Sequence, residues 1–159
     1  MIKRQTIETL MPFEIKVTRR VEFSETDMAG IMHFSNFFRF MEVAEHAFLR
    51  SLGFSVVLSK IAPSLCLPRV HASCDYKAPL RFEDEVEIHL LVTRKSRRTL
   101  GYHFQFTCGT GRARREVAHG VLTVVCAARQ PDGSLKAAPL PAVLADKIQV
   151  APAALLRAS

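Results

Sequence analysis

The residues best suited to chemistry lie in one short segment, ETDMAGIMHFSN, which spans positions 25–36. Within it, Asp27 can serve as a nucleophile or general base, and His33 can donate a hydrogen bond or relay a proton. Gly30 allows the loop to turn sharply. The segment precedes a helix-like run, and a helix N-terminus presents unpaired backbone N–H groups and the positive end of the dipole. A carboxylate beside such donors suits acyl transfer, because the N–H groups can hold a developing oxyanion.

Each candidate also has a structural interpretation. Asp27 can close an Asx turn or cap the helix, and an isolated loop histidine such as His33 is more often structural than catalytic. Glu45 lies at the edge of the apolar face of the following helix, where an acid needs a partner or a wet cavity. It is either a buried ion pair with an arginine or a second active-site carboxylate that orients water.

The elements that position these residues follow from hydrophobic periodicity. Residues 13–23 alternate between apolar and polar with one break at Arg19, which predicts an antiparallel strand with one wet face. Residues 36–52 change to helical period, with Ser35 or Asn36 as N-cap and Gly53 as C-terminal stop. The apolar arc is broad enough to predict a mostly buried helix, and it consists of Phe37, Phe40, Met41, Ala44, Ala47, Phe48 and Leu52.

Four further strands are predicted after the helix. They cover residues 69–77, 85–93, 99–108 and 116–129, and turn signals separate them. The proline-rich tail, 130–159, offers at most a short helix near 141–148. One helix cannot cover both faces of a five-stranded sheet, so the sheet is expected to wrap around it. The predicted fold class is α+β, a hotdog fold in a single domain over 1–159 with its core at about 13–129.

The sequence VEFSETDMAGIMHFSNFFRFMEVAEHAFLRSLG, residues 21–53, resembles the signature of hotdog-fold acyl-CoA thioesterases of the 4-hydroxybenzoyl-CoA thioesterase type. The similarity continues more loosely through DYKAPLRFEDEVEI to about residue 129. The resemblance implies that the chain hydrolyses an acyl-CoA, or alternatively an acyl carrier protein thioester, without a cofactor. It says little about which acyl group is used.

Residue by residue, the resemblance makes Asp27 the catalytic aspartate and Gly30 the loop glycine. It places at Phe34 the backbone N–H that polarises the thioester carbonyl, and it makes Asn36 the residue that pins the loop to the helix. His33 departs from the pattern, since many family members have an aromatic residue there. Its imidazole either assists at the carbonyl or fills the aromatic position.

The net charge of +7 comes largely from two basic runs, RKSRR at 94–98 and RARR at 112–115. Neither contains an aromatic residue for base stacking, so nucleic acid is not an expected partner. One interpretation is two solvated turns. The resemblance implies another, in which basic side chains guide the phosphates of coenzyme A; these are Arg94, Lys95, Arg97 and Arg98, together with the 112–115 run.

Other site classes find little support. The histidines and the four dispersed cysteines lack ligand spacing, so no metal site is expected, and the cysteines are interpreted as small buried hydrophobes. No apolar run approaches the roughly 20 residues of a membrane span, and the N-terminus lacks the pattern of a signal peptide. The sequence therefore predicts a cytoplasmic protein without membrane contact.

A lone hotdog leaves one sheet face and one edge uncovered. We therefore expect a homodimer, or a homotetramer as the resemblance suggests, with sites at the subunit interface. Two alternatives to the thioesterase stay open, because fold alone does not fix function. One is a non-hydrolytic protein that binds or senses acyl-CoA. The other is a dehydratase or hydratase, which would need a positioned His–acid pair, and the histidine context here does not favour it.

Overall fold

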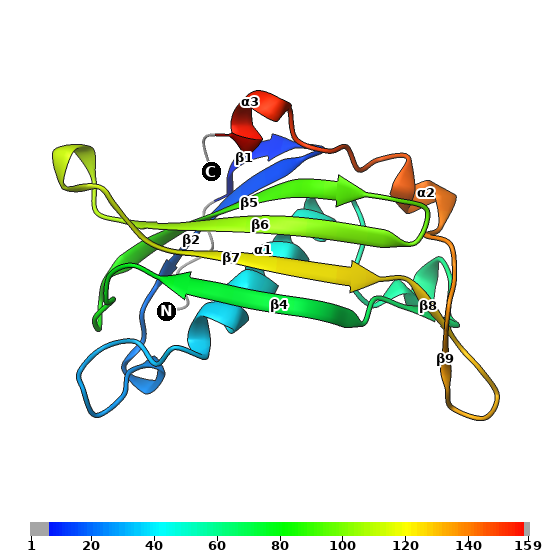
Figure 1. Ribbon diagram of the computed structural model, residues 1–159, viewed down its shortest axis with the longest axis horizontal. Coiled ribbons are helices and arrows are strands. Elements are labelled where there is room, and N and C mark those ends of the chain that lie inside the picture. The colour runs from blue at the N-terminus through cyan, green and yellow to red at the C-terminus, as the bar shows by residue number, and fades with distance from the viewer. Residues whose placement is uncertain (1–6, 158–159) are drawn as a thin grey trace.

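The computed structural model describes residues 7–157, and in it a curved antiparallel sheet wraps around one long helix (Figure 1). The sheet has six strands in the order β1-β2-β5-β6-β7-β4. Their bounds are β1 Ile7–Met11, β2 Glu14–Arg20, β4 Arg69–Tyr76, β5 Glu85–Lys95, β6 Thr99–Cys108 and β7 Arg115–Val125. The hotdog architecture expected from the sequence is confirmed. All five predicted strands are present, and β1 adds a sixth at one edge.

Two predicted strands end earlier than expected. β2 stops at Arg20, and Phe23 begins a short 3-10 helix, η1 (Phe23–Glu25), with 74% of its surface exposed. Its apolar side chain therefore does not join the core. The run 116–129 also breaks, because the Cys126 amide turns to the Arg98 carbonyl at 2.7 Å. Beyond the break, β8 (Ala127–Arg129) belongs to a small second sheet with β3 (Leu65–Cys66) and β9 (Leu135–Ala137).

Helix α1, Asn36–Ser51, fills the concave side of the sheet. Its predicted apolar arc is buried except for Leu52, which is only partly buried. The helix approaches β7 closely at Gly120, where a Cβ atom would come within 2.5 Å of Met41 Sδ. Helix α1 ends before Gly53, as predicted. Gly53 has φ +89°, its amide donates to Arg50 O, and the Phe54 amide donates to Leu49 O, which together form a Schellman motif.

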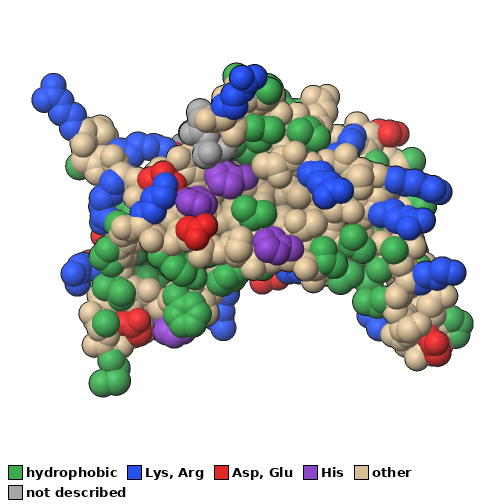
Figure 2. All heavy atoms as spheres, viewed as in Figure 1, with side chains coloured by type: hydrophobic (Ala, Val, Ile, Leu, Met, Phe, Trp, Pro, Cys, Tyr) green, Lys and Arg blue, Asp and Glu red, His purple; other side chains and the backbone are tan. Residues whose placement is uncertain are grey.

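The two faces of the sheet differ in chemistry. Alternate residues of β5 and β6 point at α1 and are fully buried, among them Ile88, Leu90, Tyr102 and Phe104. The other face carries titratable pairs such as His89 Nε2 and Glu14 Oε2, which lie 2.7 Å apart. Figure 2 shows histidine, acidic and basic side chains gathered over the middle strands on this face. The outer face of the sheet is therefore polar, in contrast to the apolar face that packs on α1.

The C-terminal segment passes the end of the sheet near the β5–β6 turn, where α2 (Ala142–Ala145) lies, and then runs back to α3 (Ala153–Leu156) beside β1 (Figure 1). Two further 3-10 helices, η2 (Leu58–Lys60) and η3 (Gly111–Ala113), lie in connectors. The described cysteines are free thiols, and only Cys108 and Cys126 are buried. No helix in the described part of the chain is both long and apolar enough to cross a membrane.

Candidate active site

The loop that carries Asp27 is a small antiparallel hairpin at one end of the sheet. The Asp27 amide donates to Ile31 O at 2.9 Å, and the His33 amide donates to Glu25 O at 2.9 Å. Gly30 closes the turn with φ +73°, a conformation that glycine adopts without the strain of a side chain. The Met32 amide donates to Leu80 O at 2.7 Å, which anchors the loop to the connector after β4. The backbone thus holds Asp27 in place.

Only one oxygen of the Asp27 carboxylate accepts a hydrogen bond from the described part of the chain. Its Oδ1 accepts a hydrogen bond from the Ala29 amide at 2.8 Å, which is the Asx turn given above as a structural interpretation. The other carboxylate oxygen has no hydrogen-bond partner among the described residues. The side chain is partly buried. The structural contact therefore orients the carboxylate and leaves one oxygen available to a ligand.

The start of α1 presents a free donor. The amides of Asn36 and Phe37 donate to His33 O at 2.9 Å and Phe34 O at 3.3 Å, so the first turn is of the 3-10 type. The Phe34 N–H finds no acceptor within residues 7–157. Asn36 is buried and its Nδ2 donates to Glu25 O at 2.8 Å, which joins the helix to the Asp27 loop. A carboxylate oxygen and an unbonded N–H are thus held on one connected frame.

His33 turns toward the helix start. Its Nδ1 lies 2.8 Å from Ser35 Oγ and also accepts from the Ser35 amide at 3.4 Å, so the proton of the neutral ring lies on Nε2. The ring packs on Phe34, with centroids 4.4 Å apart. Ser35 precedes the helix as predicted, but its hydroxyl is engaged by His33 and makes no side-chain capping bond. The predicted N-cap position is therefore confirmed, but the Ser35 side chain does not cap the helix.

Several large apolar side chains at this end of the sheet are exposed. Phe23 and Phe82 form an edge-to-face pair with ring centroids 5.8 Å apart, and Phe34 is 59% exposed. Tyr76, at the end of β4, is 46% exposed. Exposed apolar groups gathered at one place mark a ligand or protein contact more often than chance. Sequence reasoning missed Phe82 and Tyr76, although both lie in the DYKAPLRFED stretch that matched the family.

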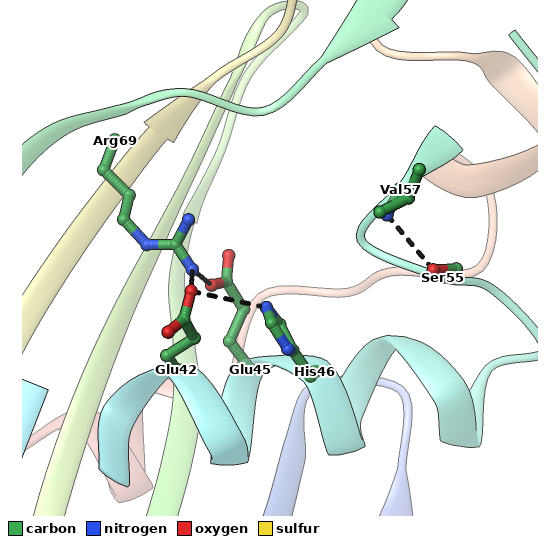
Figure 3. Close-up of polar contacts among 6 residues, drawn as sticks. All are labelled: Glu42, Glu45, His46, Ser55, Val57 and Arg69. Atoms are coloured by element: carbon green, nitrogen blue, oxygen red, sulfur yellow. Dashed lines mark hydrogen bonds and ion pairs between the residues drawn. The ribbon is translucent and has the colours of Figure 1, made fainter. Parts of the chain in front are cut away.

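Glu45 lies elsewhere. Figure 3 shows its carboxylate pointing at Arg69, with Oε2 at 2.6 Å from Arg69 Nη2, and Glu42 Oε1 shares the same nitrogen at 3.1 Å. Burial raises the pKa of Glu45 to about 7, although the Arg69 charge opposes that shift. Glu45 follows Asn36 by two and a half turns, about 13 Å along the axis. The ion-pair interpretation of Glu45 is the one that these contacts support.

The two basic runs lie at opposite ends of the sheet. Residues 94–98 form the β5–β6 turn, and the Asp27 loop lies at the other end of the long axis (Figure 1). Within one protomer, the predicted phosphate-binding residues Arg94, Arg97 and Arg98 are exposed but remote from Asp27. Lys95 donates to Ala145 O and Ile148 O at 2.9 and 2.7 Å, so it stabilises the tail. The 112–115 run lies at the same end as Asp27.

Comparison with known proteins gives consistent results. A family model, described as the thioesterase-like superfamily, matches residues 21–148. A protein of Aquifex aeolicus (strain VF5), provisionally named an esterase, is 43% identical over 95 residues, which make up 59% of this chain and 71% of that protein.

Two solved structures are similar along most of their length. A 1,4-dihydroxy-2-naphthoyl-CoA thioesterase from Synechocystis has a TM-score of 0.72 and 27% identity, covering 85% of this chain and 95% of the other. A gentisyl-coenzyme A thioesterase has a TM-score of 0.69 and 30% identity, covering 81% of this chain and 98% of the other. The residues that the family model matches include the Asp27 loop, α1 and the central strands.

Proposed function

This chain belongs to the thioesterase-like superfamily, and from that membership and the geometry of the Asp27 loop we infer that it hydrolyses an acyl-CoA thioester to the free acid and coenzyme A. One observation carries the inference at the level of residues. Asp27 keeps one carboxylate oxygen without a partner among the described residues, and the helix start beside its loop presents the unbonded N–H of Phe34. These are the two groups that hydrolysis of a thioester requires.

In the proposed reaction the thioester carbonyl oxygen accepts a hydrogen bond from the Phe34 N–H. The free oxygen of Asp27 then acts in one of two ways. As a nucleophile it attacks the carbonyl carbon, the C–S bond breaks with release of the coenzyme A thiolate, and water hydrolyses the resulting anhydride. As a general base it removes a proton from water, hydroxide adds to the carbon, and collapse of the tetrahedral intermediate breaks the C–S bond and releases the thiolate. Both routes place negative charge on the oxygen that Phe34 faces.

His33 has a supporting role in this proposal. Because its Nδ1 accepts from Ser35, the Nε2–H is the proton available for donation. It can donate a hydrogen bond to the departing thiolate, which then takes its proton from water. Gly30 forms the turn of the loop, and Asn36 Nδ2 donates to Glu25 O, so the loop and the helix start keep a fixed relative position. The role of Glu45 in this scheme is to stabilise the fold through Arg69.

We propose an aromatic acyl group as the substrate class. The related thioesterases act on 1,4-dihydroxy-2-naphthoyl-CoA and gentisyl-CoA, as their names state, and both acyl groups are hydroxylated rings. The exposed rings of Phe23, Phe34 and Phe82 at the Asp27 end support this choice, because aromatic pairs favour edge-to-face and offset contacts.

A second copy of the chain completes the proposed site. Strand β4 forms the edge nearest the Asp27 loop, and Val70 is 60% exposed along it. A two-fold axis at this edge would pair the two β4 strands in antiparallel fashion. That symmetry reverses the partner end to end, so the partner's basic β5–β6 turn would approach this Asp27 loop. Light scattering at micromolar concentration should report a dimer or tetramer, and a monomer would count against an interfacial site.

The deciding experiment measures free thiol released from acetyl-CoA, palmitoyl-CoA and 4-hydroxybenzoyl-CoA. We expect the aromatic thioester to turn over fastest and Asp27→Asn to abolish most of that turnover with the fold intact. Calorimetric binding of the aromatic thioester without any turnover would indicate an acyl-CoA-binding protein. Equal rates on the three substrates would contradict the proposed acyl class and leave the hydrolase proposal standing.

A further inference from the structure

Tyr76 reaches from the edge of the sheet to the start of α1. It is the last residue of β4, and its hydroxyl donates a hydrogen bond to the Phe34 carbonyl oxygen at 3.3 Å. The two residues are 42 positions apart in the chain. This contact therefore connects a strand of the sheet to Phe34, whose N–H has no acceptor among the described residues.

The backbone around Phe34 needs such a contact. The exposed Phe34 side chain gives it little packing, and Ser35 supplies no capping bond because its hydroxyl is paired with His33. The peptide before Phe34 is fixed by the bond from the Asn36 amide to His33 O at 2.9 Å. The peptide after it is held by the Phe37 amide at 3.3 Å and by the Tyr76 hydroxyl.

The Tyr76 ring is itself anchored. It meets the buried Phe37 ring edge-on, with centroids 5.1 Å apart, and Phe37 in turn contacts Phe106 at 5.3 Å. Phe37 and Phe106 belong to the hydrophobic core. These ring contacts fix the position of the Tyr76 hydroxyl, because an aromatic side chain has only two rotatable bonds and loses little freedom when it packs.

We propose that Tyr76 is a positioning residue for thioester hydrolysis, whose hydroxyl holds the Phe34 backbone so that its N–H meets the carbonyl oxygen in the transition state. The inference rests on the proposed function, in which that N–H stabilises the oxyanion. An oxyanion donor is effective only when it is oriented before the charge develops. Tyr76 acts through Phe34 and needs no contact with the substrate.

Tyr76→Phe tests the inference, since it removes the hydroxyl and keeps the ring. We expect kcat for the best substrate of the panel to fall about 5- to 20-fold, with KM within about twofold, because a hydrogen bond that orients a transition-state contact is lost. Tyr102→Phe is the matched control. The Tyr102 hydroxyl is fully buried and has no hydrogen-bond partner among the described residues, so kcat should stay at the wild-type value.

Hydrogen exchange supplies a readout independent of activity. Amides in the peptide covering residues 33–38 should exchange faster in Tyr76→Phe than in the wild type, while the unfolding midpoint stays within a few degrees of that of the control. A rise in KM at constant kcat would overturn the inference in favour of direct substrate contact. Unchanged kcat with unchanged exchange would overturn it outright, and so would a large fall in the midpoint.

These results are separable from those for the function itself. If the wild type released no thiol from any thioester, the proposed function would fail, and exchange in residues 33–38 would still decide whether Tyr76 holds the helix start. If the wild type and Asp27→Asn behave as expected but Tyr76→Phe matches the wild type in both readouts, only the positioning role is lost.

Discussion

Two carboxylates of this chain, that of Asp27 in the loop before α1 and that of Glu45 within α1, have contrasting environments. Asp27 lies in a backbone-bonded hairpin, half buried, with one oxygen bonded to the Ala29 amide and the other without a partner among the described residues. Glu45 is completely buried; its Oε2 pairs with Arg69 Nη2 at 2.6 Å, its Oε1 has no hydrogen-bond partner among the described residues, and burial raises its pKa to about 7. Each carboxylate has one partnered oxygen, but that of Asp27 is partly exposed and held by the backbone, whereas that of Glu45 is enclosed beside a cation.

The difference between Asp27 and Glu45 indicates that, in this domain, the residues proposed for catalysis and those that stabilise the fold are different ones. A reacting group needs an atom that is free to contact the substrate and a rigid backbone that positions it. At Asp27 that backbone is held by main-chain hydrogen bonds, which a side-chain substitution leaves in place. A buried charge needs a partner, because an unpaired charge in the core costs several kcal/mol. We therefore expect substitutions at the Asp27 end to change activity with little effect on stability, and substitutions at Glu45 and Arg69 to do the reverse.

The largest effect should come from Asp27→Asn. Asparagine can keep the turn contact with the Ala29 amide but cannot attack or take a proton, so we expect kcat/KM to fall by about 10³-fold, equivalent to about 4 kcal/mol. The free energy of unfolding should change by less than about 0.5 kcal/mol. Thiol-release kinetics and urea unfolding measure the two quantities.

Asp132→Asn is the matched control for this prediction. Asp132 Oδ1 accepts from the Ser134 amide at 2.9 Å in a turn of the same kind, in the β8–β9 hairpin. Its activity should equal that of the wild type. If both variants lost the same small amount of activity, Asp27 would be a turn residue only, and the contrast between the two carboxylates would disappear.

The second effect in size should come from Arg69→Met. Methionine keeps the apolar length of the arginine stem but leaves Glu45 without a partner, so unfolding free energy at pH 8 should fall by about 3 kcal/mol. At pH 5.5, where Glu45 is protonated, the loss should be only about 1 kcal/mol, close to that of one hydrogen bond. Urea unfolding at both pH values makes the comparison. An equal loss at both would show that Arg69 stabilises through packing alone.

The third prediction concerns the wild type. The folded-state pKa of Glu45, about 7, lies above its value in the unfolded chain, so the folded state binds more protons between the two values. Stability is therefore highest below about pH 4.5 as far as this group is concerned, and it falls as the pH rises to about 7. We expect a loss of about 2 kcal/mol between pH 5 and pH 8.

The Glu45→Gln variant should remove this pH dependence and stay folded. Glu42→Gln is its control, because Glu42 contacts the same Arg69 nitrogen but is half exposed. That variant should keep most of the slope of the wild type, because burial contributes more than the Glu42 charge to the raised pKa of Glu45. A wild-type stability that does not change over this pH range would mean that Glu45 is ionised throughout, and that Arg69 fully compensates for burial.

Most of the scaffold was predictable because it follows from periodicity. Alternation placed the five strands from residue 13 onward, and the broad apolar arc placed α1 within the sheet, since each pattern has only one way to bury its apolar side. The thioesterase family was predictable because the 21–53 signature combines a turn glycine, an acid and a helix start at fixed spacing. The end of α1 was predictable from Gly53, because the left-handed conformation favours glycine.

What could not be predicted depends on contacts between distant residues. No local pattern indicated that the Arg69 side chain would reach Glu45, or that Tyr76 would reach Phe34. The break at Cys126 was hidden because the residues on both sides remain apolar, while their hydrogen-bond partners change from β6 to the tail. The basic turn at 94–98 has the composition of a phosphate site, but composition does not tell at which end of a sheet a turn lies.

The smallest expected effect is that of Ser35→Ala, which removes one hydrogen bond to His33 at the start of α1. A serine that caps α1 would cost about 1 kcal/mol when replaced by alanine. Here the hydroxyl lies 2.8 Å from His33 Nδ1 instead, so unfolding free energy should change by less than about 0.3 kcal/mol. The variant should lose activity by two- to fivefold, because the His33 ring is then less firmly oriented. His33→Phe keeps an aromatic ring at that position, and it should lose more activity than Ser35→Ala if the imidazole takes part. Equal activity in both variants and the wild type would show that His33 only fills the aromatic position, and that Asp27 and the Phe34 N–H carry the reaction between them.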